Sequence, residues 1–600
     1  MVSAVLLAAA SGAGSTPSAG STTYAGSTTY AGYQASPDVR PMHATVASDA
    51  MGTAVATGTA VATGTAVATG TANATGTANA TGATHSTEPT KAGEHPAEVA
   101  WAASKWGDPA TDAKAKNKGK NNPGQDAGSL ATVATSIGAR DLWKKKDPEG
   151  RAITGQGVTV ALIDTGVDTS VPGLNGPGKV IKGPDLSFEA NSVDLRGQDT
   201  FGHGTHMGSI IAARDAVPVK PQTGCPEPAD ASVQLGIAPD ARLLAVKVGA
   251  SDGTADVSQV IAGLDWVVQH RNDNGMQVRV INLSYGTLSA QPYLLDPLAA
   301  AAENAWKHGI VVVVSGGNEG LAAGRLTDPA IDPYVIAVGA SDARADVANW
   351  SKPTVATFSS RGSLDRHVDL VAPGASIAGL RASGSYIDVQ HPEGLVSGDT
   401  TGRLFRGSGT SQAAAVTSGA AALLLQAYPD LTPDQVKATI VNTARKIIGT
   451  EIDRGAGQLD LSGALAEAKK LSKKEDKGKD DSAQTFPEAT GAGSLEAARG
   501  GGNVIDPETG LALRGEIDVQ NNSWDGSAWW AASVSGTAWV GGEWNGARWS
   551  GDAWSGAVWM NAGWDGERWT GARWSDVSWT GAVWAGSRWT GSGWTGQGWQ

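Results

Sequence analysis

Residues 158–166 read VTVALIDTG, a run of apolar and β-branched residues that leads directly into Asp164. Such a run predicts a buried strand over 158–163. The carboxylate of Asp164 would then stand at the carboxyl end of a strand, where α/β proteins gather their functional sites. Taken alone, the same aspartate is better explained as a residue that caps a turn before Gly166.

Outward from this strand, short β-branched runs alternate with Ala- and Leu-rich stretches. Strands are expected over 158–163, 243–248, 278–283, 310–314 and 335–338, and helices over 257–270, 298–308 and 412–427. This alternation predicts an α/β fold, a parallel sheet with helices on both faces. A further helix start is marked by Thr432 as N-cap, Pro433 at the first helical position and Gln435 at the third.

Two other short peptides carry the residue types that would complete a catalytic site with Asp164. Residues 203–206 read HGTH and residues 409–411 read GTS, so that acid, base and hydroxyl follow in the order Asp, His, Ser. A buried Asp164 can accept the imidazole N–H of His203 and stabilise the imidazolium that forms when His203 takes the proton of Ser411. His206 is expected to be structural. Ser411 would begin the helix over 412–427, and the alternative for it is an ordinary N-cap serine.

Asn318 follows the strand expected over 310–314, in a Gly-rich loop. Its amide could donate a hydrogen bond to the oxyanion of a tetrahedral intermediate, together with the backbone N–H of Ser411. The alternative is an asparagine that stabilises a tight turn. With Asp164, His203 and Ser411 all present, the oxyanion role is favoured.

These peptides, in this order, resemble motifs of the subtilisin-like peptidases. Residues 236–239 (GIAP), 281–286 (INLSYG) and 315–320 (SGGNEG) share the resemblance, which covers residues 137–465. It implies a subtilisin-like α/β domain, a closing strand over 457–460, and a serine endopeptidase that acts on proteins or peptides. It also implies that no cofactor is needed for catalysis. The family often binds calcium structurally, but the sequence assigns no ligands for it.

The resemblance further implies that Ser284, Tyr285 and Gly286 form the extended segment that binds the substrate backbone, with Tyr285 where leucine is more usual. The sequence departs from the family at Gln412 and Ala415, which stand where methionine and proline are common. That departure puts local packing in doubt but removes no proton-transfer group. The residues before 137 show no α/β pattern of the kind that an inhibitory propeptide would have.

Composition excludes several functional classes. The formal net charge of −13 argues against nucleic acid as a partner. Cys225 is the single cysteine, so no internal disulfide can form. No stretch approaches the roughly 20 apolar residues that span a bilayer. Residues 1–10 (MVSAVLLAAA) resemble the end of a secretory signal, so a secreted or surface-associated protein is expected.

The chain divides by composition into four regions. Residues 1–130 are signal-like and then low in complexity, and are expected to be disordered. Residues 131–470 form the peptidase domain, and residues 471–505 are expected to be a charged and Gly/Ala-rich linker. Residues 506–600 hold a repeat in which, from Trp524 to Trp599, a tryptophan stands at every fifth position except Val534.

The tryptophan array suggests weak, additive binding to a cell wall or polysaccharide surface, and a self-packed repeat without a ligand is as well supported. Because a linker would separate the array from the catalytic residues, deleting 503–600 is expected to leave peptide cleavage nearly unchanged. The function predicted for the whole chain is a serine endopeptidase. The alternative is a surface-adhesion protein with a silent protease-like domain.

Overall fold

The computed structural model describes residues 126, 128–190, 192, 194–217, 233–320, 322–343, 353–475, 481–505 and 511–545, and the strand residues 547–548, 558–559 and 562–563. The low-complexity region as far as residue 125 lies outside the described residues. So do Cys225 and most of the tryptophan repeats after residue 545.

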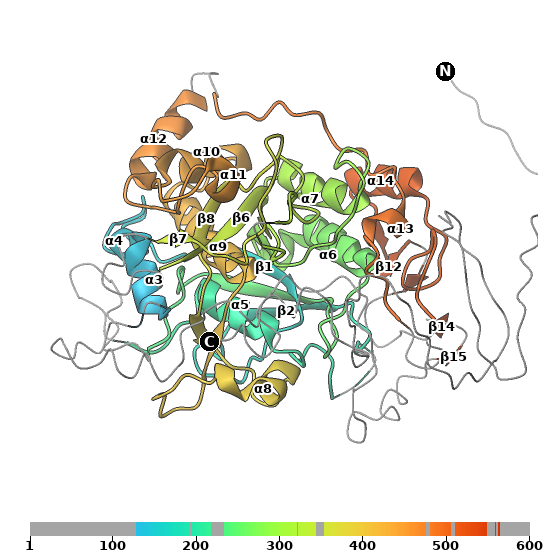
Figure 1. Ribbon diagram of the computed structural model, residues 1–600, viewed down its shortest axis with the longest axis horizontal. Coiled ribbons are helices and arrows are strands. Elements are labelled where there is room, and N and C mark those ends of the chain that lie inside the picture. Colours follow the sequence, from blue (N-terminus) through green and yellow to red (C-terminus); the bar gives the residue numbers. More distant parts are fainter. Residues whose placement is uncertain are drawn as a thin grey trace, which may run out of the picture. The chain divides into compact units, whose positions relative to one another are not determined.

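An eight-stranded sheet forms the centre of the described residues (Figure 1). Its strands follow the order β2 (Val180–Asp185), β3 (Arg242–Lys247), β1 (Thr159–Asp164), β4 (Val278–Leu283), β5 (Val311–Ser315) and β6 (Ile336–Asp342). Both β7 (Thr354–Val355) and β8 (Leu370–Pro373) pair with β6. Every pairing except that of β7 is parallel, which confirms the predicted parallel sheet.

Helices cover both faces of this sheet. On one side α5 (His203–Ala212) packs against α9 (Thr410–Ala427), and on the other α6 (Val257–His270) packs against α7 (Pro297–Lys307). Gly208 of α5 lies against Leu162, whereas Gly263 of α6 lies against the next residue of β1, Ile163. Successive strand residues point to opposite faces, so these two helices lie on opposite sides of β1.

The other elements before residue 476 surround the sheet: α3 (Leu130–Ser136), α4 (Ala139–Trp143), η2 (Asp273–Gly275), β9 (Ile377–Leu380), α8 (Tyr386–Gln390), η4 (Pro392–Gly394), β10 (Leu404–Gly407), α10 (Pro433–Thr443), α11 (Glu451–Arg454) and α12 (Ala464–Glu475). The start predicted for α10 is confirmed, because Thr432 and Gln435 cap one another. The closing strand expected over 457–460 is wrong. Gln458 forms only isolated bridges, to Val371 of β8 and to Arg445.

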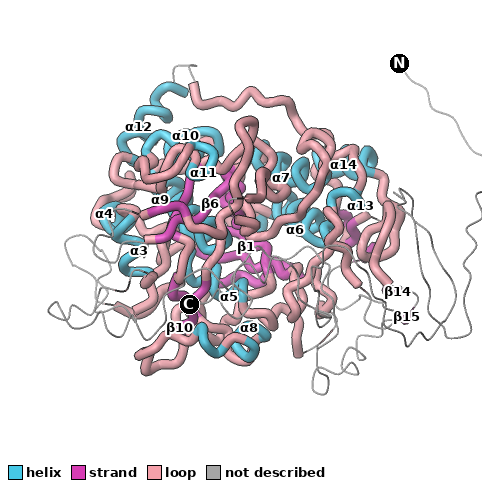
Figure 2. The backbone as a smooth tube through the Cα atoms, viewed as in Figure 1, coloured by secondary structure: helices cyan, strands magenta, loops and turns pink. Residues whose placement is uncertain are grey.

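Residues 481–545 pack against α6 and α7 (Figure 1). They contain α13 (Leu495–Ala498), α14 (Gly526–Val534), β11 (Trp539–Val540) and β12 (Glu543–Trp544); β13 (Ala547–Arg548), β14 (Val558–Trp559) and β15 (Ala562–Gly563) follow. Apart from α13, residues 481–505 run mainly as loop alongside α7 (Figure 2). This packing differs from the open linker expected over 471–505. The glycines that suggested a linker instead allow close backbone approach, as at Gly500 against Leu288.

The first tryptophans of the repeat face the interior. The indole N–H groups of Trp529 and Trp544 both donate to Oδ2 of Asp265 in α6, at 2.8 and 2.9 Å, and Ser533 donates to Oδ1. Trp524 lies against both Trp529 and Trp544, so these first tryptophans pack on α6 and on one another. The expectation that deleting 503–600 would be nearly neutral no longer follows, because the deletion would leave Asp265 without these three donors.

The hydrogen bonds to Asp265 predict a stability change that depends on pH. Burial, only partly offset by the three hydrogen bonds, raises the pKa of Asp265 to about 6. Because the folded pKa lies above the unfolded one, this group's contribution to stability falls as pH rises from about 4 through about 6, where the buried charge forms. Trp544→Phe removes a donor to that charge and should lower the free energy of unfolding by about 1–3 kcal/mol at pH 8 and by less at pH 4.5.

Urea denaturation of both proteins at the two pH values measures this difference. Trp539→Phe is the matched control, since its indole donates to the backbone carbonyl of Ala262, which does not titrate. Trp539→Phe should lower the free energy of unfolding by the same amount at both pH values. If the free energy of unfolding that Trp544→Phe loses does not change with pH, Trp544 does not stabilise the buried charge of Asp265.

Candidate active site

Asp164 and His203 are hydrogen-bonded at the carboxyl edge of the sheet. Asp164 is the last residue of β1 and His203 the first of α5, and both are fully buried. Nδ1 of His203 lies 2.8 Å from Oδ1 and 3.0 Å from Oδ2 of Asp164. A carboxylate only accepts hydrogen bonds, so the proton of a neutral imidazole belongs on Nδ1 and Nε2 is the basic nitrogen.

The start of α5 is held by Asp199, which the sequence reasoning missed. Its carboxylate accepts the backbone N–H groups of Gly202 and Thr205, both at 2.7 Å, and the hydroxyl of Thr165 at 2.8 Å. The same threonine oxygen accepts the N–H of Gly204 at 2.9 Å. Asp199 thus ties the first turn of α5 to the residue after Asp164. An aspartate four residues before the histidine was the available signal, as a capping residue.

The glycines of the motif let these two elements meet. A Cβ atom on Gly204 would lie 2.0 Å from the carbonyl oxygen of Gly166. Gly202 adopts a φ of 105°, which side-chain-bearing residues rarely take. The distance between Asp164 and His203 therefore depends on glycine at both places.

Ser411 lies in the first turn of α9, which begins at Thr410, with Gly409 as the N-cap residue. The ordinary N-cap alternative for Ser411 is therefore wrong. Ser411 is buried, and its backbone carbonyl accepts a hydrogen bond from the hydroxyl of Ser284 at 3.4 Å. Since Ser284 directly follows β4, this bond places the first turn of α9 at the carboxyl edge of the sheet, where α5 also begins with His203. The positive end of α9 favours negative charge beside Ser411.

Asn318 is joined to this turn through Thr410. Its side-chain oxygen accepts the backbone N–H of Thr410 at 2.8 Å and the Thr410 hydroxyl at 3.0 Å. These bonds fix which end of the amide faces α9, and the Nδ2 donor lies on the other end. The structure therefore brings Asn318 beside Ser411, three residues after β5.

The segment 284–286 continues β4 beside the same helix. Ser284 is fully buried between Asn282, which donates to its hydroxyl at 3.0 Å, and the Ser411 carbonyl. Tyr285 is also fully buried, and its hydroxyl donates to the carbonyl of Ala255 at 3.3 Å. What this segment can offer a substrate is consequently its backbone, together with Gly286, and not the tyrosine ring.

A buried charge cluster lies beneath the site and was also missed from the sequence. Lys247 pairs in register with Asp164, and its ammonium lies 3.0 Å from Glu189 and donates to the Thr165 carbonyl at 2.7 Å. Burial opposes the charge of Lys247, but Glu189, followed by Asp185 and Asp199, outweighs it and raises the lysine pKa. No local sequence pattern marks this pairing, because Lys247 and Glu189 are far apart in sequence.

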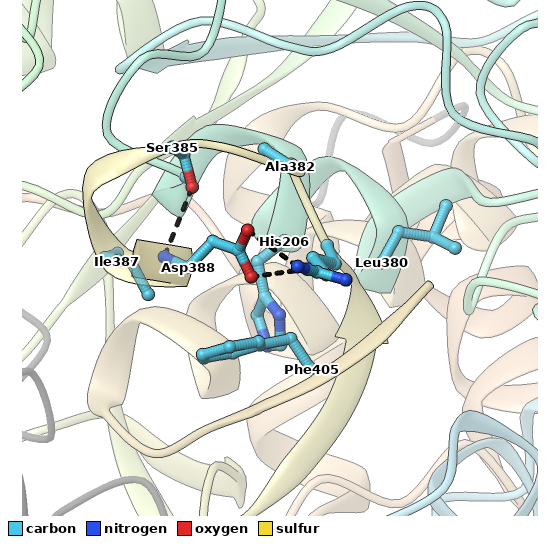
Figure 3. Close-up of a pocket in the computed structure, with 9 residues that line it drawn as sticks. His206, Leu380, Ala382, Ser385, Ile387, Asp388 and Phe405 are labelled. Atoms are coloured by element: carbon cyan, nitrogen blue, oxygen red, sulfur yellow. Dashed lines mark hydrogen bonds and ion pairs between the residues drawn. The ribbon is translucent and has the colours of Figure 1, made fainter. Parts of the chain in front are cut away.

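His206 lines a pocket on the side of α5 that faces β9 and β10 (Figure 3). Burial, and to a lesser degree His203, lowers its pKa to about 3, so the ring stays neutral. Arg381 and Asp388 form an ion pair in the same pocket, and Phe405 lies beside them. This environment agrees with a structural histidine.

Among the described residues, no group of three or more His, Cys, Asp or Glu side chains is placed to hold a metal ion. The structural calcium suggested by the family resemblance therefore stays a prediction without ligands. Within the same part of the chain, no helix combines the length and apolar character needed to cross a membrane.

Comparison with known proteins gives consistent matches. The model of the Subtilase family matches residues 155–493. Serine protease AprX of Bacillus subtilis (strain 168) is 35% identical over 303 residues, which cover 50% of this chain and 63% of that protein. Subtilisin DY of Bacillus licheniformis is 31% identical over 326 residues, or 54% of this chain and 96% of that protein.

A solved structure of a cold-adapted subtilisin-like serine proteinase aligns with 54% of this chain and 97% of its own, at 26% identity and a TM-score of 0.38. The family match covers more than half of the 600 residues and continues past the sheet into the segment that packs on α7. It includes Asp164, His203, Asn318 and Ser411. The chain therefore belongs to the subtilase family.

Proposed function

We propose that the protein is a serine endopeptidase that hydrolyses peptide bonds through an acyl-enzyme intermediate. The observation that supports this most is the buried Asp164–His203 pair at the sheet edge that the first turn of α9, with Ser411, also reaches. Membership of the subtilase family supports the same reaction class. The comparisons give no support to the adhesion alternative.

In the proposed reaction Ser411 attacks the substrate carbonyl while Nε2 of His203 takes the hydroxyl proton. Asp164 keeps the imidazole in the required tautomer and stabilises the imidazolium. The oxyanion accepts hydrogen bonds from Nδ2 of Asn318 and from the backbone N–H of Ser411. His203 then gives the proton to the leaving amine, and water hydrolyses the acyl-enzyme by the reverse proton transfers.

Fluorophosphonate labelling of the purified full-length protein, with mass-spectrometric mapping of the modified residue, tests this proposal. The label is expected on Ser411, because a complete triad makes it the one hyper-reactive hydroxyl. Absence of labelling and of peptide cleavage in a folded sample would refute the peptidase function.

The oxyanion assignment predicts a selective loss in Asn318→Ala. Removing one such donor should lower kcat by about 10²–10³-fold with KM little changed, a magnitude measured in subtilisin, itself a family member. Since Asn318 also anchors Thr410, Asn318→Asp is the companion variant: it keeps acceptor oxygens for Thr410 but lacks the amide donor. Both variants should lose kcat in steady-state assays. A kcat within threefold of wild type in Asn318→Ala would exclude the role.

We also infer that the protein acts outside the cell or at its surface, which the apolar run over 1–10 supports. Amino-terminal sequencing of protein from the culture supernatant tests this. Material found only in the cytoplasmic fraction would contradict it.

Binding of a cell wall or polysaccharide remains a proposal for the repeats after residue 545, supported by the regular indoles. Retention on insoluble cell wall, compared with and without residues 546–600, decides between this ligand and self-packing. Equal retention would contradict it.

A further inference from the structure

A fully buried ion pair joins the carboxyl-terminal segment to α6. Nε of Arg499 lies 2.6 Å from Oδ2 of Asp256, and neither side chain has any exposed surface. The guanidinium also donates to the carbonyls of Gly515 and Ile517 and to Glu496. Arg499 is thus bonded in several directions at once, which makes it a rigid connection between the carboxyl-terminal segment and the start of α6.

Asp256 directly follows a loop that borders the candidate site. The loop starts after β3, where the N–H of Val248 donates to the carbonyl of Asp164 at 2.8 Å. Midway, Gly253 lies so close to the ring of Phe201 that a Cβ would approach it to 2.7 Å, and Phe201 stands two residues before His203. The loop ends at Ala255, whose carbonyl accepts the hydroxyl of Tyr285. Asp256 is the next residue and the N-cap of α6.

The carboxyl-terminal segment also contacts the loop that follows the segment 284–286. Residues 490 and 493 donate their backbone N–H groups to the carbonyls of Leu294 and Leu295, both at 2.8 Å. Ser494 and Gln291 exchange two hydrogen bonds, at 2.8 and 2.9 Å. Residues 490–500 therefore contact both Asp256, directly after the first loop, and the loop that follows Gly286.

We propose that Arg499 is a positioning residue for substrate binding, acting through Asp256 and Ala255 on the segment 284–286. The proposal rests on the peptidase function proposed above. The guanidinium of Arg499 bonds to Asp256, to Glu496 and to two backbone carbonyls, so its loss should affect how a peptide is held more than the reactivity of Ser411.

The carboxyl-terminal segment, residues 481–545, also offers a matched control for Arg499. Its second buried attachment, Trp544 on Asp265, lies nine residues further along α6 than Asp256, about 13 Å at the helical rise. Trp544→Phe should therefore weaken the attachment of the carboxyl-terminal segment to α6 without changing substrate binding.

The experiment measures four quantities in the full-length protein. They are KM and kcat for a peptide substrate with at least four residues before the scissile bond, the rate of fluorophosphonate labelling, and Tm. Arg499→Met should raise KM by about tenfold, the equivalent of one lost strong interaction, with the labelling rate within about threefold of wild type. Arg499→Lys, which keeps the charge beside Asp256, should restore part of the KM. Trp544→Phe should lower Tm and leave KM unchanged.

If Arg499→Met does not fold because Asp256 is left buried and unpaired, the double variant Asp256→Asn/Arg499→Met removes both charges and should show the same rise in KM. A folded variant with wild-type KM overturns the proposal. An equal rise in KM in Trp544→Phe also overturns it, since the effect would then be general destabilisation. A wild-type protein that neither labels nor cleaves refutes the peptidase function itself, which separates the two failures.

Discussion

Ser411→Ala is expected to abolish fluorophosphonate labelling and to lower kcat for peptide cleavage by about a million-fold, the loss measured for the nucleophile of subtilisin, a member of this family. The hydroxyl is the only group that the substitution removes. Alanine is the best helix former, and position 411 lies within α9, so the fold should be retained. Near-UV circular dichroism and Tm check the fold, and single-turnover assays measure the residual rate.

Ser418→Ala is the matched control for that result. Ser418 lies in the same helix, is equally buried, and donates a hydrogen bond to Asn282 at 2.9 Å. Its loss should cost stability but leave labelling of Ser411 intact. If the Ser411→Ala protein still takes the label, or if the label maps elsewhere, the nucleophile has been misassigned.

The sheet and its helices could be predicted because their signals are local. The residues of α6 were predicted as 257–270, which are the observed bounds, and the capping pair Thr432 and Gln435 marked the start of α10. In both cases an apolar period and a capping residue stand within one short stretch of sequence. The order of Asp164, His203 and Ser411 was equally visible, because each follows or begins a regular element.

Groups that stabilise the site through distant partners could not be predicted. Lys247 and Glu189 are separated by nearly sixty residues, and each looks like an ordinary surface charge until β3 is placed beside β2. The same holds for the tryptophan repeat. A period of five indicates a repeat unit, but not that Asp265 on α6 would be the acceptor for Trp529 and Trp544.

The orientation of the Asp164 carboxylate leads to the second large prediction. Oδ1 accepts the backbone N–H of Thr165 at 2.7 Å, and both oxygens lie within 3.0 Å of Nδ1 of His203. In Asp164→Asn one of the two atoms that face Nδ1 becomes an NH₂ group, which donates hydrogen bonds, and the negative charge is lost. The NH₂ group favours the tautomer in which Nδ1 accepts a hydrogen bond and the ring proton lies on Nε2.

An imidazole protonated on Nε2 cannot take the proton of Ser411, so Asp164→Asn should lower kcat by about 10⁴-fold, as in other triads whose aspartate is replaced by asparagine. KM should stay within about twofold, because Asp164 is buried behind the imidazole and is not expected to contact substrate. Steady-state kinetics on the folded variant measure both constants, and ¹⁵N NMR of the imidazole reports the tautomer directly. A kcat within tenfold of wild type, or an imidazole still protonated on Nδ1, would show that Asp164 does not set the state of His203.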